Sequence, residues 1–211
     1  MRPILIAFMT LILIACAGNV TYKDPINRGQ SQYFITVDKP RDVVWNSSIP
    51  ELGKKIFVIN NIDKSSGLIN LSYSGNPEDF IDCGRIISHV QNLAGSRTYD
   101  FAGATPNQYY EVMHNGNLFN VLRKISLEGR MNLIFEEITP TQTKITANTR
   151  YIVNRNIQIQ RVGHNTIPQT MNDSISFNTG SNASFPADRN GRASFCVPTG
   201  VLERDILSMI K

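Results

Sequence analysis

Two long runs of mixed apolar and polar residues, at 126–138 and 143–155, most limit how this chain of 211 residues can fold. In the second run, four residues from Ile145 to Tyr151 occupy alternate positions, which places them on one face of a strand. The short segment 139–142 between the runs contains proline, which suits a turn. The two runs therefore predict an antiparallel hairpin with one buried face.

A second hairpin is predicted nearer the N-terminus, from the β-rich runs 56–59 and 68–73 around the turn residues 63–67. A short strand beginning at Gln32 and a helix beginning at Asp38 precede it. Pro50 predicts that this helix is kinked or split near Ser48. The predicted buried stripe of the helix consists of Val44, Trp45, Ile49 and Leu52.

The C-terminal part predicts a last strand at 192–197 and then a helix capped by Thr199. Leu202, Ile206 and Ile210 form the apolar stripe of that helix. Two segments, 93–117 and 163–190, are rich in Gly and Asn, and we expect long loops there with only short strand-like pieces.

This order of elements predicts an α+β fold, in which an antiparallel sheet carries an N-terminal helix after the first strand and a C-terminal helix. We expect one such domain, over 32–211, because the apolar fraction of 41% suffices for a packed core. The net charge is +4, and its Lys and Arg residues are scattered along the chain. Nucleic-acid binders concentrate basic residues on one face, so no nucleic-acid partner is predicted.

An apolar run at 4–14 follows Arg2 and is too short to cross a bilayer, which takes about 20 helical residues. It is typical of an export signal, which we assign to residues 1–15. The last residues of this region, Leu13-Ile14-Ala15-Cys16, resemble the lipobox of bacterial lipoproteins. The resemblance implies cleavage before Cys16, a diacylglyceryl group on its sulfur and a further acyl chain, such as palmitate, on its amino group. An ordinary signal peptidase that cuts after Ala17 and releases a soluble protein is the alternative.

By the same resemblance, Ala17 after the cysteine favours the outer membrane, because an aspartate there favours retention in the inner membrane. We expect the protein to be anchored in the outer membrane by its lipid and to face the periplasm. Residues 16–31 are polar and without periodicity, which predicts a lipidated cysteine followed by a flexible tether with a reach of about 20 Å.

Cys83 and Cys196 are the two remaining cysteines, and an even pair in an exported chain predicts a disulfide. Two buried thiols are the alternative. Neither cysteine has a second Cys or His at ligand spacing, so no metal site is predicted.

Residues for catalysis are sparse. The histidines are His89, His114 and His164, and Glu111 with His114 makes a single carboxylate–histidine pair in a Gly/Asn-rich stretch. Cys83 as a nucleophile is disfavoured, because the neighbouring Asp82 would raise the pKa of its thiol. We therefore predict no catalytic residue, no cofactor and no enzyme activity.

The segment 196–207, with its Cys, Thr-Gly, Leu-Glu and Ile-Leu, resembles the closing segment of small, uncharacterised proteobacterial lipoproteins. The order of strand, helix and hairpin at 32–73 is similar to that of the helix-grip domains of the C subunit of the outer-membrane β-barrel assembly machinery. Both resemblances imply a location in the envelope more than an activity.

The sequence therefore favours a lipoprotein that acts through protein contacts, as a non-catalytic accessory subunit of an envelope complex. An envelope protein is the expected partner, beside the membrane itself. A carrier of a small apolar ligand, held between the sheet and its helices, is the main alternative, and an envelope hydrolase is a third.

Overall fold

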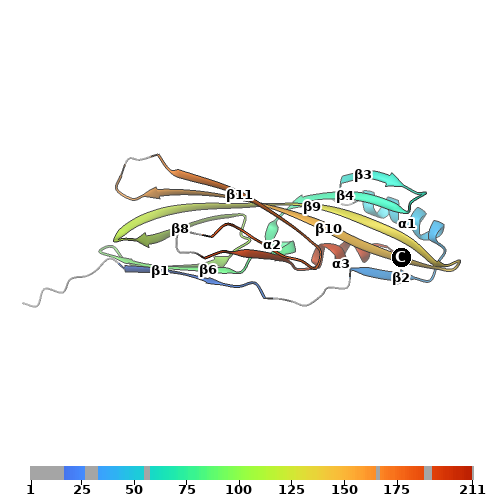
Figure 1. Ribbon diagram of the computed structural model, residues 1–211, viewed down its shortest axis with the longest axis horizontal. Coiled ribbons are helices and arrows are strands. Elements are labelled where there is room, and N and C mark those ends of the chain that lie inside the picture. The colour runs from blue at the N-terminus through green and yellow to red at the C-terminus, as the bar shows by residue number, and fades with distance from the viewer. Residues whose placement is uncertain (1–16, 27–32, 55–57, 165–166, 188–191, 211) are drawn as a thin grey trace, which may run out of the picture.

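The protein is an elongated, mostly β molecule in the computed structural model, which describes residues 17–26, 33–54, 58–164, 167–187 and 192–210 (Figure 1). The described residues form three β-sheets and three short helices. The predicted α+β class is therefore wrong. The reason is that segments expected to be loops or tether are strands, which pair with partners far away in the sequence.

A long central hairpin runs through the largest sheet. Its strands are β9 (Asn117–Thr139) and β10 (Gln142–Arg161), which pair from the turn at Thr139 as far as Phe119 opposite Arg161. The hairpin was predicted, but its strands extend well beyond residues 126 and 155. The extension was missed because polar residues such as Arg123 and Asn156 interrupt the apolar pattern there.

Shorter strands complete this seven-stranded antiparallel sheet along both edges of the hairpin. The edge of β9 pairs with β8 (Asn107–His114) and, further along, with β4 (Leu68–Gly75), which in turn pairs with β3 (Val58–Asp63). The edge of β10 pairs with β11 (Gln169–Asn178) and with β2 (Phe34–Val37). Each long strand thus pairs with two short strands at different positions along its length. The sheet therefore has two halves, one with β8 and β11 and the other with β2, β3 and β4.

Helices cover the inner face of one half, around the β9–β10 turn. They are α1 (Arg41–Gly53) and α3 (Val201–Leu207). The predicted stripe of α1 is confirmed for Val44, Trp45 and Leu52, which are buried, whereas Ile49 is only partly buried. The ring of Trp45 meets Phe135 of β9 edge-on at 5.1 Å. The predicted split is wrong, because α1 continues through Pro50. The predicted cap of α3 is also wrong, since Gly200, with a left-handed φ of 71°, occupies that position in place of Thr199.

A second sheet covers the inner face of the other half. Its strands are β1 (Ala17–Lys23), β6 (Arg85–Asn92) and β7 (Gly95–Ala102), in the order β1-β6-β7. Phe101 of β7, Tyr110 of β8 and Val121 of β9 form a separate small core between the two sheets. The segment 93–117, predicted as a loop, therefore supplies two strands of this half.

The flexible tether predicted over 16–31 is also corrected in part. Residues 17–23 are strand β1, held along its whole length against β6. Cys16 and residues 27–31 lie outside the described residues, as does Gln32. The prediction of a loop over 163–190 is also corrected. This segment contains β11, a ten-residue strand that pairs with residues 150–159 of β10.

A small third sheet lies near the middle of the molecule and carries the predicted disulfide. It contains β12 (Ala183–Ser184), β13 (Phe195–Pro198) and β5 (Ile81–Asp82), which follows the short helix α2 (Pro77–Phe80). Cys83 and Cys196 are bonded and buried, which confirms the pairing across 113 residues. The hydroxyl of Tyr22 in β1 lies 3.2 Å from the carbonyl oxygens of both Cys83 and Phe195, so the bridge also fixes the N-terminal strand.

We expect loss of the disulfide to lower the free energy of unfolding by about 2–5 kcal/mol, because the bridge closes a long loop in the unfolded chain. Urea denaturation of the full chain, with and without reductant, measures this difference. The variant carrying both Cys83→Ala and Cys196→Ala is the control, since reductant has nothing to break in it. An oxidised wild type no more stable than the reduced wild type would contradict a stabilising role.

Candidate contact surface on the outer sheet face

The large sheet has one face that no other layer of the described residues covers, which we call the outer face. It arises from the strict alternation along β9, where Lys124 and Ser126 are exposed while Arg123 and Ile125 are buried. Strand β10 alternates in the same way, with Asn154 exposed between the buried Val153 and the partly buried Arg155. The outer face is therefore mostly polar, with Leu122, Ile134 and Ile152 among the apolar exceptions.

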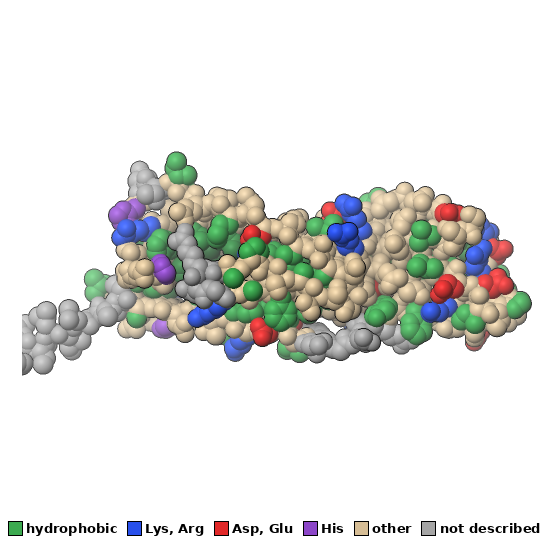
Figure 2. All heavy atoms as spheres, viewed as in Figure 1, with side chains coloured by type: hydrophobic (Ala, Val, Ile, Leu, Met, Phe, Trp, Pro, Cys, Tyr) green, Lys and Arg blue, Asp and Glu red, His purple; other side chains and the backbone are tan. Residues whose placement is uncertain are grey.

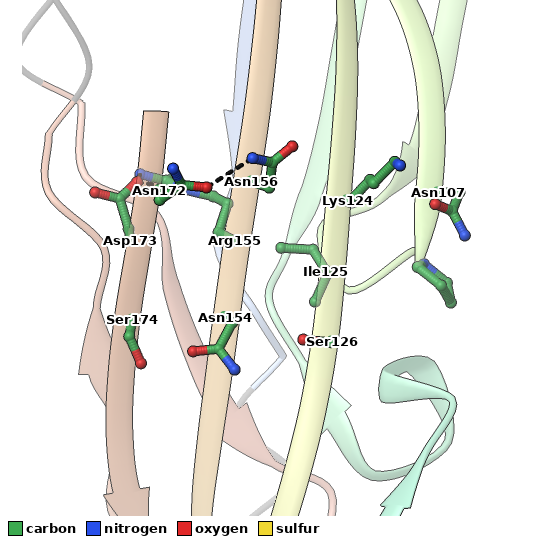
Figure 3. A pocket seen from close by; sticks show the side chains of 11 residues that line it. Asn107, Lys124, Ile125, Ser126, Asn154, Arg155, Asn156, Asn172, Asp173 and Ser174 are labelled. Carbon is green, nitrogen blue, oxygen red and sulfur yellow. Dashed lines mark hydrogen bonds and ion pairs between the residues drawn. The ribbon is translucent and has the colours of Figure 1, made fainter. Parts of the chain in front are cut away.

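Polar side chains line up across the strands of the outer face in the half that contains β8 and β11. The strand registers place four residues in one row: Asn107, Lys124, Asn156 and Asn172. They place three in the next row: Ser126, Asn154 and Ser174. The amide of Asn156 donates a hydrogen bond to the side-chain oxygen of Asn172 at 2.6 Å, as Figure 3 shows.

These two rows line an open groove with a volume of about 510 Å³, which we call the outer groove. Its lining also includes Pro106, Ile125, Arg155 and Asp173. Arg155 is held rigidly, because its guanidinium bonds the carboxylate of Asp173 at 2.7 Å and lies 4.2 Å above the ring of the buried Phe185. The groove is thus shaped by fixed backbone and by an ion pair that is already satisfied.

Lys124 gives the outer groove its available charge. No carboxylate of the described residues pairs with its ammonium group, and Asp173, the acidic residue of the lining, is bonded by Arg155 through two nitrogens. Besides the Arg155–Asp173 pair, the side chains around the groove are one cation, several amides and hydroxyls, and the apolar Pro106 and Ile125. The polar side chains suit a partner with a carboxylate or carbonyl group.

A second cavity, of about 390 Å³, lies beside the disulfide and includes Lys23, Glu78, Asp82 and Arg85 in its lining. The carboxylate of Asp82 accepts hydrogen bonds from the backbone N–H groups of Gly84 at 2.8 Å and Ile26 at 3.2 Å. Glu78 accepts one from the hydroxyl of Thr105. These acidic groups hold the local chain together, which is a structural role.

The histidines of the sequence do not assemble a catalytic site with one another. His89 bonds the hydroxyl of Thr98 at 2.9 Å, while His114 and His164 lie at two different turns. Glu111 pairs with Arg97 at 2.5 Å and accepts a bond from Tyr99, so its carboxylate is committed. Within the described ranges, no three His, Cys, Asp or Glu residues are close enough to hold a metal ion. No helix of that same part of the chain is long and apolar enough to cross a membrane.

Glu203 is a buried carboxylate in the first turn of α3. It accepts hydrogen bonds from the hydroxyls of Tyr151 at 2.8 Å and Thr179 at 2.7 Å. Burial and the negative charge of Glu203 raise the pKa of Tyr151 far above its usual value. The phenol therefore stays protonated and continues to donate its hydrogen bond to Glu203. The network fastens α3 to β10, and neither Tyr151 nor Glu203 lines the outer groove.

Arg123 is a buried charged residue whose hydrogen bonding is incomplete. Its side chain is 2% exposed, and its Nη1 atom has no hydrogen-bond partner among the described residues. Burial lowers the pKa of its guanidinium to about 10, against the usual 12.5, and the charge of nearby Arg155 adds to the effect. The charged form of Arg123 is therefore disfavoured in the folded protein.

We expect Arg123→Met to raise the free energy of unfolding by about 1–3 kcal/mol. The substitution removes a buried charge whose desolvation cost is not offset by a full set of hydrogen bonds. A lowered pKa in the folded state means that the wild type carries this cost below pH 10 and loses it as the pH rises further. The stability difference between wild type and variant, measured by urea denaturation, should therefore shrink above pH 10. A variant less stable than the wild type at neutral pH would show that the guanidinium is well solvated after all.

No family model matches the chain, and neither the curated proteins nor the solved structures contain a significant match. Function is accordingly inferred from the residues of this chain and from their geometry.

Proposed function

We propose that the protein is an outer-membrane-anchored periplasmic lipoprotein that acts through protein contacts, as a non-catalytic accessory subunit of an envelope complex. The outer groove is the contact surface. The observation that carries this proposal is the uncovered polar face, with two cross-strand rows of amides and hydroxyls around the unpaired Lys124.

The lipid anchor is supported by the sequence Leu13-Ile14-Ala15-Cys16 and by the disulfide, which fits an oxidising compartment outside the cytoplasm. Three acyl chains on one cysteine would make attachment lasting, since each buried methylene contributes about 0.8 kcal/mol. Strand β1 begins at Ala17, the next residue after Cys16. The anchor would therefore join directly to a folded strand.

The alternative of an apolar ligand carrier receives less support from the geometry. The space between the large sheet and its helices is filled with buried side chains, among them Trp45, Phe135, Ile145 and Ile206. The two cavities described above are open and are lined with many polar side chains. A preformed apolar pocket, which such a carrier would need, is not among them.

We expect Cys16→Ser to abolish lipidation and to leave the domain folded. The intact mass of the wild type should exceed that of the processed polypeptide by three acyl chains and glycerol, and the variant should lack this excess. Its free energy of unfolding should stay within about 0.5 kcal/mol of the wild type, because the folded core lies elsewhere. A wild type that begins at Gly18 and carries no lipid would instead support cleavage after Ala17.

Photo-crosslinking in living cells tests the outer groove. A photoreactive amino acid at Ser174 should give a discrete adduct with an envelope protein, whereas the same group at Asp205, exposed on α3, should not. Adding Lys124→Glu should lower the yield at Ser174 about tenfold, as expected when a hydrogen bond to a charged group is lost.

Lys39→Glu is the matched control, because it makes the same change of charge at an exposed lysine near the β9–β10 turn. The crosslinking yield at Ser174 in the Lys39→Glu variant should equal the yield at Ser174 without that substitution. Equal adducts at Ser174 and Asp205, or a yield at Ser174 indifferent to Lys124→Glu, would rule out the groove as the contact surface.

A further inference from the structure

One end of the molecule gathers the start of β1 and three turns, and we call it the β1 end. Ala17 lies opposite Gln91 of β6, next to the β6–β7 turn at Leu93 and Ala94. Gly18 lies against Met113, close to the β8–β9 turn, which places the second sheet and the large sheet at the same end. The β10–β11 turn follows Arg161, which pairs with Phe119 at the start of β9. Figure 1 shows these turns together at the left.

The β1 end carries the two most exposed large apolar side chains in the described part of the protein. Ile167 is 93% exposed and Leu93 is 85% exposed, and both lie in or beside turns. Val162 and Met171, in and beside the β10–β11 turn, are also exposed. Isolated exposed apolar residues are ordinary in folded proteins. Several of them at the turns of two sheets, all at one end of the molecule, form a surface that another apolar surface can contact.

The charges of the two ends differ. Residues 86–98, 112–120 and 158–172 contain no Asp or Glu. The cations there are Arg97, which pairs with Glu111 of β8, and Arg161, and the three histidines lie in the same segments. The opposite end, around the β9–β10 turn, carries charges of both signs. Its carboxylates are those of Asp38, Asp42, Asp63, Glu136 and Glu137, and its cations include Lys39, Arg41, Lys64 and Lys144, with Asp42 paired to Lys64 and Glu136 to Lys144. Figure 2 shows the histidines at the left and both acidic and basic groups at the right. The β1 end is therefore distinguished by its lack of carboxylates in these segments, which leaves little to repel an anionic surface.

We propose that the β1 end rests in the interface of the phospholipid bilayer, with Leu93 and Ile167 buried among the acyl chains. The proposal rests on the proposed function, because the lipidated Cys16 would deliver this end to the membrane. Since β1 is paired from Ala17 onward, the anchor cannot move away from the β6–β7 turn as a flexible tether would allow. The molecule then stands on the membrane, and the end with the β9–β10 turn points away.

Fluorescence quenching tests this orientation in the full-length lipidated protein, reconstituted in vesicles of phosphatidylethanolamine and phosphatidylglycerol with brominated acyl chains. The variant Leu93→Trp should lose most of its added fluorescence to bromine and shift its emission to the blue. Ile138→Trp is the matched control: Ile138 is 50% exposed at the opposite end, and its tryptophan should be indifferent to bromine. Trp45, which is buried, contributes the same background to both variants.

Each other outcome is decisive. A blue-shifted Leu93→Trp that bromine does not quench would mean that protein, such as a second copy of the chain, covers the β1 end, and would overturn the proposal. Equal quenching at both positions would overturn the standing orientation. If mass spectrometry finds no lipid on Cys16, the proposed function fails separately. Cosedimentation of the unlipidated chain with these vesicles, abolished by Leu93→Asp, would then still support a membrane-facing end, and its absence would refute it.

Discussion

The backbone pairing between β9 and β10 is the interaction on which the rest of the structure depends. Because these strands stay in register from the turn at Thr139 as far as Phe119 and Arg161, they span both halves of the large sheet. Strands β4, β8, β11 and β2 each pair with only part of one of them. Both halves of the large sheet are built on the hairpin, and both hydrophobic cores include residues from its inner face.

The inner and outer faces of this hairpin meet different requirements. Inward residues face α1 and α3 in one half and the β1-β6-β7 sheet in the other. The inward side chains of the same two strands must therefore pack against helices in one half and against a sheet in the other. Arg123 lies on this inner face, close to the point where the layer packed on the sheet changes from helices to the β1-β6-β7 sheet. We attribute its incomplete hydrogen bonding to this position between the two cores. Outward residues meet solvent in both halves, which exposes amides, hydroxyls and the ammonium group of Lys124.

Sequence patterns predicted the local elements well and the distant pairings poorly. The hairpins, the buried stripe of α1 and the Cys83–Cys196 bridge follow from periodicity, turn residues and cysteine number. Strands β1, β7 and β8 were missed because each lies at or near a sheet edge and alternates weakly, and its stability comes from partners it meets only after folding. The outer groove was invisible for the same reason: its rows join residues from β8 to β11, and only the strand registers bring them together.

The antiparallel pairing of β1 with β6 also has a mechanical consequence. The strand begins at the β1 end and runs inward toward the disulfide, where the hydroxyl of Tyr22 bonds the carbonyl oxygens of Cys83 and Phe195. A force that pulls on Ala17 along the strand loads the hydrogen bonds with β6 in shear, so all of them share it, because these bonds lie across the strand direction. A peeling force would break them one at a time. The geometry therefore makes the N-terminal strand of this protein resistant to tension applied at Ala17.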